Sequence, residues 1–275
     1  MRDIDIDPYE HTPRDAVVTA NDYGDGLHFA RHSHQRGQFA YAACGVITVL
    51  TDQGNWVVPP QRAVWVPAHV PHEMHMHGPV TMLNSYIRPI AATRLGLPAY
   101  CQVFGVSALL RQLLIRAMDV PALYAEDQRD GHLMNLLLHE IADMQPLSLN
   151  APLPSEPRLA LACSTLLRQP SLAVGIDDMC RQVAMSRRTF TRLFREQTGI
   201  SFVEWRQQAC LLMAVVRLGN GEPVTRVATD LGYSSPSAFT GVFRRVLGQA
   251  PSRYFAQTTR LDEPLALHSH KGPHG

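Results

Sequence analysis

The strongest constraint on the fold is a pattern of short helices that occurs twice between residues 176 and 255. Each copy has a short amphipathic stretch, a tight turn, and a second helix with an apolar face. The first copy runs from Ile176 to Gly199 and the second from Val224 to Gly248. Helix, short turn and helix is the arrangement of the helix-turn-helix unit. The sequence therefore predicts an all-α C-terminal domain that contains two such units.

The second helix of each copy has matched start and stop signals. Ser186 and Ser235 can each accept a hydrogen bond from the backbone at a helix start, and Pro236 is tolerated in a first turn. Gly199 and Gly248 can close the two helices in a left-handed conformation.

These two helices also have a second, polar face. Arginines dominate it in the first helix, and small residues join arginines in the second. A helix that packs through one side and offers charge on the other suits the major groove of DNA. The candidate DNA-contacting residues are Ser186, Arg187, Arg188, Thr191, Arg192, Arg195, Ser235, Pro236, Ser237, Gly241, Arg244 and Arg245.

A continuous helix is predicted between the units, from Phe202 to Leu218. At about 1.5 Å per residue it would span roughly 25 Å. A rod of that length can hold two reading helices near one turn of B-DNA apart, on the order of 34 Å.

This arrangement, ending in G-Y-S-S-P-S-A-F-T-G-V-F-R-R-V-L-G-Q-A-P-S-R-Y-F, resembles the DNA-binding domain of the AraC/XylS family of bacterial regulators. The base-reading positions of that family fall on Arg188, Thr191, Arg192, Pro236, Ser237 and Gly241. Gly241 departs from the pattern, because many members carry a longer polar or basic side chain there. The second unit is therefore expected to hold phosphates mainly through Arg244 and Arg245.

The charge distribution supports a division into two parts. The formal net charge is +1, yet residues 1–155 hold ten Lys or Arg and fifteen Asp or Glu. Residues 156–257 hold thirteen Arg and seven Asp or Glu. A basic segment joined to an acidic one is typical of a nucleic-acid-binding domain attached to a domain with another role.

Other features predict a soluble cytoplasmic protein. The five cysteines are odd in number and form no C-x-x-C pair, so neither a disulfide framework nor a zinc finger is favoured. The acidic N-terminus does not resemble a signal peptide, and no stretch is long and apolar enough to span a membrane. No membrane association is expected.

The N-terminal part is predicted to be a small β-barrel or sandwich. Residues 1–20 are interpreted as a loosely ordered lead-in, and short alternating segments with turn signals follow it. The predicted strands cover residues 27–34, 38–43, 46–51, 56–58, 63–66, 72–77 and 80–87.

Histidines are unusually dense in this part, with seven of the thirteen between residues 28 and 77. His32 and His34 share one face of a strand, and Gln38 follows four residues later. This spacing resembles the first motif of the cupin superfamily, with Gln38 where a glutamate often stands. Residues 67–72 resemble the second motif more loosely, with His72 at the ligand position and His69 where a glycine is expected.

The cupin resemblance implies that His32, His34 and His72 meet, with Gln38 as a weaker fourth ligand. Three imidazoles suit Zn, Ni, Fe or Mn, and the sequence does not choose among them. A metal-free barrel whose histidines line a pocket or the surface is the alternative. Trp56 and Trp65 could line a small-molecule pocket, or be core aromatics.

Two amphipathic helices are predicted after the barrel, over residues 108–117 and 132–144. They could pack on their own barrel or form a homodimer, which the family resemblance favours. The fold class is thus α+β: a cupin-like barrel, helices, then an all-α domain whose two helix-turn-helix units are joined by a long helix. The predicted domains are residues 1–97 (sensor barrel), 98–145 (helical dimerisation segment), 146–157 (linker), 158–257 (DNA-binding domain) and 258–275 (disordered tail).

The function that fits best is a transcriptional regulator, not an enzyme. Its partners would be double-stranded DNA and a small-molecule or metal effector. One alternative is a constitutive DNA-binding protein whose barrel only dimerises. The other is a cupin metalloenzyme, against which stands the shortage of acid or base groups near the histidines, since Glu73 is the only nearby carboxylate.

Overall fold

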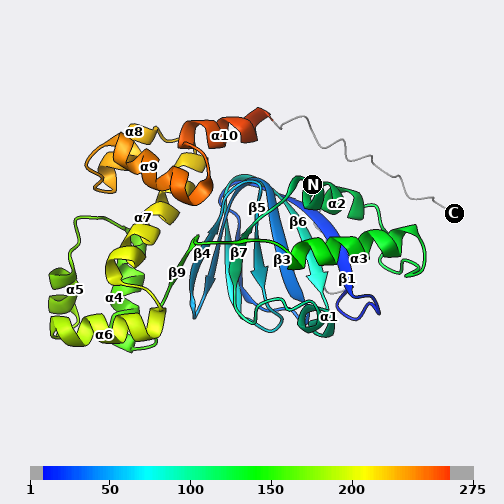
Figure 1. The fold of residues 1–275 in the computed structure, drawn as a ribbon, viewed down its shortest axis with the longest axis horizontal. Helices are drawn as coiled ribbons and strands as arrows, with labels where there is room; N and C mark the ends of the chain where they lie inside the picture. Colours follow the sequence, from blue (N-terminus) through cyan, green and yellow to red (C-terminus); the bar gives the residue numbers. More distant parts are fainter. Residues whose placement is uncertain (1–8, 261–275) are drawn as a thin grey trace.

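The computed structural model describes residues 9–260. A β-barrel with three helices on one side is followed by a purely helical domain at the other side (Figure 1). This is the predicted α+β class. Residues 1–8, and residues 261–275 of the predicted tail, lie outside the described residues.

The barrel consists, within the described residues, of a nine-stranded antiparallel sheet built around two long strands. Its path is β1-β6-β3-β5-β7-β8, with β2 beside β6, β4 beside β3, and β9 beside β4. The strands are β1 (Ala16–Tyr23), β2 (His28–His32), β3 (Gly37–Thr51), β4 (Gly54–Val58), β5 (Arg62–Val66), β6 (His72–Ile87), β7 (Gln102–Gly105), β8 (Pro146–Leu147) and β9 (Asn150–Pro152).

The long strands β3 and β6 each merge two of the predicted shorter strands. Their register shifts between Ala42 and Val46, where the chain bends. Gly45 lies in this bend at φ 72°, and a Cβ there would come within 2.5 Å of the Pro79 carbonyl oxygen. Glycine is needed at this position because no side chain fits the close approach.

Several strands differ from the sequence-based expectation. The sequence predicts a loosely ordered segment over residues 1–20. In the structure, Ala16–Tyr23 instead forms β1, which pairs with β6. Residues 146–157 do not form a free linker either, because β8 pairs with β7 and β9 pairs with β4. Leu149 and Ala151 in this segment are fully buried. Tertiary pairing overrides the weak local strand preference of these short, proline-containing stretches.

The outer face of the barrel is covered by helices near residues 83–87 of β6. Phe39, Tyr41 and Leu83 pack with buried residues of these helices, whereas Ala40 and Ala42 point to the opposite face. The covering helices are α1 (Pro89–Arg94), α2 (Ala108–Ala117) and α3 (Arg129–Ala142). The two predicted amphipathic helices are therefore present, and their buried stripes pack on their own barrel.

The helical domain is built as the sequence predicts. Its elements are α4 (Pro157–Arg168), α5 (Ile176–Gln182), α6 (Arg187–Thr198), α7 (Phe202–Gly219), α8 (Val224–Asp230), α9 (Pro236–Leu247) and α10 (Pro251–Arg260). An aromatic cluster joins α6 to α7, with the Phe194 ring centred 5.7 Å from Phe202 and 5.9 Å from Trp205. This packing fixes the angle of α6 on the long helix.

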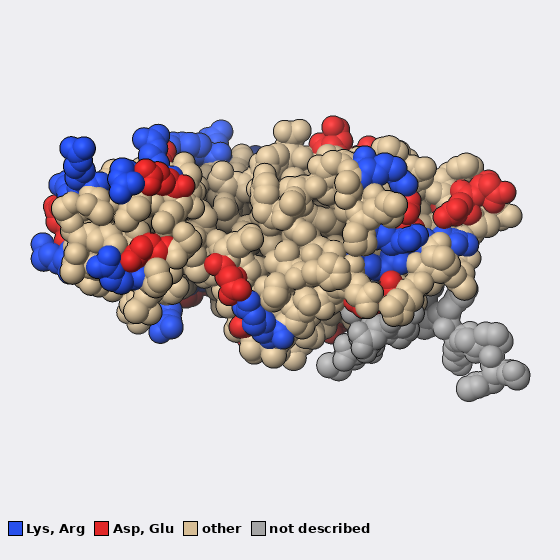
Figure 2. Space-filling view, turned by 90° about the horizontal axis from the view of Figure 1, so that it is seen from below, with Lys and Arg blue, Asp and Glu red and all other residues tan. Residues whose placement is uncertain are grey.

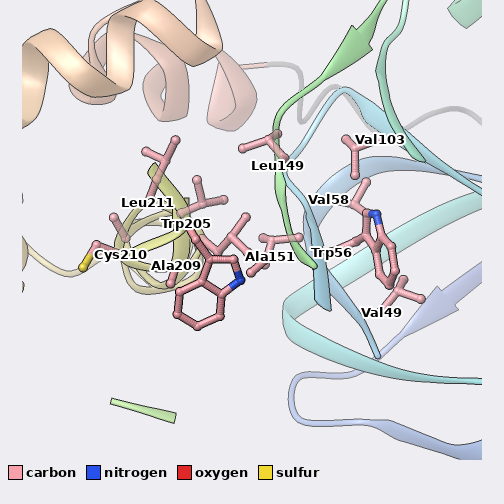
Figure 3. Packing of buried hydrophobic residues seen from close by; sticks show 14 of the residues in the cluster. Val49, Trp56, Val58, Val103, Leu149, Ala151, Trp205, Ala209, Cys210 and Leu211 are labelled. Carbon is pink, nitrogen blue, oxygen red and sulfur yellow. The ribbon is translucent and has the colours of Figure 1, made fainter. Parts of the chain in front are cut away.

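The two parts of the molecule share a buried contact (Figure 3). Figure 3 places Trp205 and Ala209 of α7 on the side facing Ala151 of β9. The indole nitrogen of Trp205 donates a hydrogen bond to the carbonyl oxygen of Pro152 at 2.7 Å. The segment predicted as a linker is therefore the surface on which α7 packs.

Candidate functional site

The first helix-turn-helix unit is formed by α5 and α6. The Ser186 hydroxyl accepts a hydrogen bond from the backbone nitrogen of Thr189 at 3.2 Å, which caps the start of α6. Gly199 closes the helix at φ 78°. Both predicted boundary residues have the expected roles.

The polar face of α6 is exposed to solvent. A shallow hollow on this face is lined by Arg187, Arg188, Thr191, Arg192, Arg195 and Glu196. Arg192 forms an ion pair with Glu196 at 2.9 Å, and Arg187 lies 3.4 Å from Asp177. Exposed pairs of this kind are weak, on the order of 0–1 kcal/mol. The arginines can therefore be redirected toward a phosphate or a base.

The second unit, α8 and α9, presents a less charged surface. Ser235 caps α9 by accepting from the Ala238 backbone nitrogen at 3.1 Å, and Pro236 occupies the first turn. Ser237 and Gly241 are exposed, and a Cβ at Gly241 would meet nothing within 4 Å. This part of α9 can approach another surface closely through its backbone.

Arg244 and Arg245 are exposed near the end of α9. Neither forms an ion pair with any residue between 9 and 260. Unpaired guanidinium groups near an otherwise small-residue face are well suited to phosphate contacts.

Helices α6 and α9 lie at opposite ends of α7 (Figure 1). With 18 residues, α7 is roughly 27 Å long, close to the repeat of about 34 Å between successive major-groove faces. Arg217 near its end bonds Glu222 and Asp230, each at 2.6 Å, which ties α7 to the second unit. Figure 2 shows basic side chains, all of them arginines, gathered at the end of the molecule that this domain forms.

A group of three histidines lies in the barrel. One ligand atom from each of His32, His34 and His72 lies within 4.8 Å of the others. The ring centres of His32 and His72 are 4.4 Å apart, and those of His34 and His72 are 5.3 Å apart. The structure thus brings together the three histidines that the sequence singled out.

Hydrogen bonds orient two of these rings. Nδ1 of His72 lies 2.9 Å from the carbonyl oxygen of Val70, and Nδ1 of His32 lies 2.7 Å from that of Ala30. When Nδ1 carries the proton, the lone pair of Nε2 is free for a ligand. His72 is fully buried, and burial lowers its pKa to about 4, so its ring is neutral at pH 7.

Gln38 lies on the interior face of β3, opposite Tyr86 in register. Its amide nitrogen donates to Oδ1 of Asn84 at 2.9 Å, while its amide oxygen is buried and has no hydrogen-bond partner in the part of the chain that the structure describes. His69 adopts φ 63°, a left-handed conformation that favours glycine. This is the position at which the second cupin motif has its glycine.

The two candidate pocket tryptophans lie on different faces of the sheet. Trp56 belongs to the cluster that contains the interior residues Val49 and Val58 (Figure 3). Trp65 packs on the helix-covered face, and its indole nitrogen donates to the carbonyl oxygen of Pro98 at 2.8 Å. The two side chains therefore do not share one cavity.

A second group of ligand-type side chains was not singled out by the sequence motifs. His28 of β2 lies together with Glu73 and His75 of β6 on the outer face of these two paired strands. Alternation along residues 72–77 could have indicated it, because odd-numbered positions there face away from His72. The partner strand of β6 was needed to bring His28 beside them.

No helix among residues 9–260 is long and apolar enough to cross a membrane.

Both the N-terminal and the C-terminal part of the chain match known protein families. Residues 16–142 match the AraC-like ligand binding domain, and residues 179–257 match a helix-turn-helix domain. The transcriptional regulator NimR of Escherichia coli K12 is 32% identical over 235 residues, covering 86% of this chain and 85% of that protein. The arabinose operon regulatory protein of the same organism is 26% identical, covering 74% and 63%.

Solved structures give weaker overall similarity. ToxT of Vibrio cholerae bound to an unsaturated fatty acid has a TM-score of 0.37 at 12% identity, covering 87% of this chain and 94% of its own. The DNA-binding domain of AdpA in complex with target DNA has a TM-score of 0.36 at 32% identity, covering 38% and 96%. With its two matched domains and a regulator similar over most of its length, this chain belongs to the AraC family of DNA-binding transcriptional regulators and carries an N-terminal ligand-binding domain.

Proposed function

We propose that this regulator binds its operator through α6 and α9 in two successive stretches of major groove, and that a divalent transition metal in the barrel controls this binding. The observation that carries the metal proposal is the buried Nε2 of His72, which has no hydrogen-bond partner among residues 9–260 and belongs to a three-histidine group.

The residues fit a metal by their chemistry. A buried imidazole nitrogen without a partner is costly, by about 1–3 kcal/mol, unless something binds it. The pKa of His72 lies well below neutrality, so no proton competes for that nitrogen at pH 7. His32, His34 and His72 would hold the ion. The buried amide oxygen of Gln38, which no described residue hydrogen-bonds, could be a weaker fourth ligand. The bound ion would offer an open position to an oxygen or nitrogen atom of a small effector.

In the DNA-binding domain, we assign base contacts and phosphate contacts to different exposed side chains. Arg188, Thr191 and Arg192 of α6 have the length and donors to read base edges. Ser237 and Gly241 of α9 bring the backbone close, while Arg244 and Arg245 supply phosphate contacts. The first unit would therefore contribute most of the sequence preference.

Control requires that the metal favour one arrangement of the two domains. The inner histidines and the α7-packing surface belong to one continuous sheet, since β6 carries His72 on one face and His75 on the other. A ligand that shifts the backbone of β6 at His72 can thus also shift the outer surface of the sheet against which α7 packs.

We also propose that the chain acts as a homodimer through α2 and α3. Although the main stripes of these helices pack on the barrel, Leu109 and Leu136 remain 49% and 45% exposed. A second copy of the same helix pair would bury them. Light scattering of Leu109→Glu and of the wild type checks this contact.

The test of the regulatory proposal compares operator binding with and without metal. The operator is first selected from a random DNA library, and its affinity is measured by fluorescence anisotropy for the chelated and the Zn²⁺-, Ni²⁺-, Fe²⁺- or Mn²⁺-loaded protein. We expect one of these ions to change the affinity, and His72→Ala to abolish the change.

The control variant is His139→Ala, which removes an exposed histidine of α3. It should respond to metal like the wild type. Equal affinity in all metal states would instead favour the constitutive regulator, in which the barrel serves only for dimerisation.

A further inference from the structure

The outer face of β6 carries ligand-type side chains that are separated from the inner histidines by the sheet. His28 lies directly opposite His75 in the antiparallel register of β2 and β6. Glu73 precedes His75 by two residues, so the three side chains share one face. His72 is adjacent to Glu73 in sequence and therefore points to the other face.

The three side chains converge on a small volume. Oε2 of Glu73 lies 3.5 Å from Nε2 of His28 and 3.9 Å from Nε2 of His75. The two imidazole rings are stacked, with centres 4.2 Å apart and planes inclined by 24°. One ligand atom from each residue lies within 4.8 Å of the others.

An ion pair alone does not explain this arrangement. Nε2 of His75 is buried and has no hydrogen-bond partner among the described residues, since Glu73 is too far away for one.

Neutral imidazole nitrogens and a carboxylate oxygen are the ligands of borderline divalent metals. We propose that His28, Glu73 and His75 form a second transition-metal site, on the outer face of β6, that takes an ion such as Zn²⁺. With three protein ligands, the site leaves a coordination position for water or another donor.

The location gives this site access to the domain boundary. His75 also lines a cavity of about 240 Å³ between the barrel and the helical domain. The opposite wall of that cavity is formed by α7, including Leu212, Met213 and Val216, and by Leu167 of α4. The outer site therefore lies beside the contact between the two domains.

The experiment is a Zn²⁺ titration of the full-length, chelator-treated protein by isothermal calorimetry. The variants are His28→Ala/His75→Ala, Glu73→Gln, the inner-site variant His72→Ala, and the control His77→Gln. His77 lies on the same face of β6 but is 2.9 Å from the Thr48 hydroxyl, outside the proposed ligand set. The C-terminal histidines are present in every variant, so their contribution cancels in the comparison.

We expect the double variant to lose one Zn²⁺ equivalent that the wild type and His77→Gln bind, and Glu73→Gln to bind that equivalent more weakly. His72→Ala should retain it, which separates this site from the inner one even if the inner site binds no metal. Circular dichroism verifies the fold, and Glu73→Gln carries the test if the double variant does not fold. Unchanged stoichiometry and affinity in the outer-site variants would overturn the proposal.

Discussion

The hydroxyl of Tyr254, in α10, donates a hydrogen bond to the carbonyl oxygen of Pro60 in the barrel at 2.7 Å. The bond is buried and joins residues 194 positions apart in sequence. The guanidinium of Arg62 lies 5.4 Å from the centre of the Tyr254 ring and adds a cation–π contact. The DNA-binding domain thus contacts the barrel through α10 as well as through α7.

Replacing Tyr254 with Phe should destabilise the protein by about 1–3 kcal/mol, because the Pro60 carbonyl oxygen loses its buried donor. The free energy of unfolding, measured by urea denaturation, checks this. Tyr100→Phe is the matched control, since Tyr100 is 57% exposed and should change stability little. Equal stability of the two variants would mean that water replaces the lost hydroxyl.

Gly219, at the end of α7, is a second point of close contact with the barrel. A Cβ at this residue would lie 2.5 Å from Cγ2 of Val46 in β3. Gly219→Ala should therefore force α7 away from the barrel and lower the unfolding midpoint, although alanine favours helix. Val46→Ala should relieve this loss when combined with it, which a double-mutant cycle measures.

Gly241→Ala is the matched control for that cycle. Gly241 lies inside α9 with open space around its Cβ position, so alanine should stabilise the helix by about 0.5–1 kcal/mol. If Gly219→Ala were equally stabilising, α7 would not be held closely against Val46, and the contact could not couple the barrel to α7.

The helical domain was predictable because its signals are local. Ser186, Ser235, Gly199 and Gly248 fix helix ends through bonds to neighbours only three or four residues away. The apolar spacing of α6 then determines which face is buried and leaves the arginines outside. The local pattern already predicts that the arginines of α6 are exposed, and the family resemblance adds only their role in DNA binding.

The barrel was less predictable because its pairing is long-range. β1 pairs with β6 across more than fifty residues, and β9 reaches back to β4, so no local pattern marks either strand. The sequence does not distinguish a pocket role for Trp65 from a core role, because the helices that bury its side chain come from later in the chain. The outer group at Glu73 also depends on β2 pairing with β6.

Arg192 is the sharpest test of base reading by α6. Arg192→Ala should cost about 1–3 kcal/mol on the selected operator and relax base preference at the position it contacts. Loss of its exposed ion pair with Glu196 changes folding stability little. Anisotropy titrations with operator and random DNA measure the two affinities, with Arg129→Ala in α3 as control. Equal losses on both DNAs would assign Arg192 to phosphate instead.

Arg244 should behave differently, because we place it on the DNA backbone. Arg244→Ala should weaken binding to operator and random DNA alike, since a phosphate contact carries no base information. It should also reduce the slope of log affinity against log salt concentration by about one, because one fewer counterion is released. Titrations at several salt concentrations measure that slope for the wild type, Arg244→Ala and Arg129→Ala. A loss confined to the operator, with an unchanged slope, would show that α9 reads bases and that the small side chain at Gly241 does not prevent it.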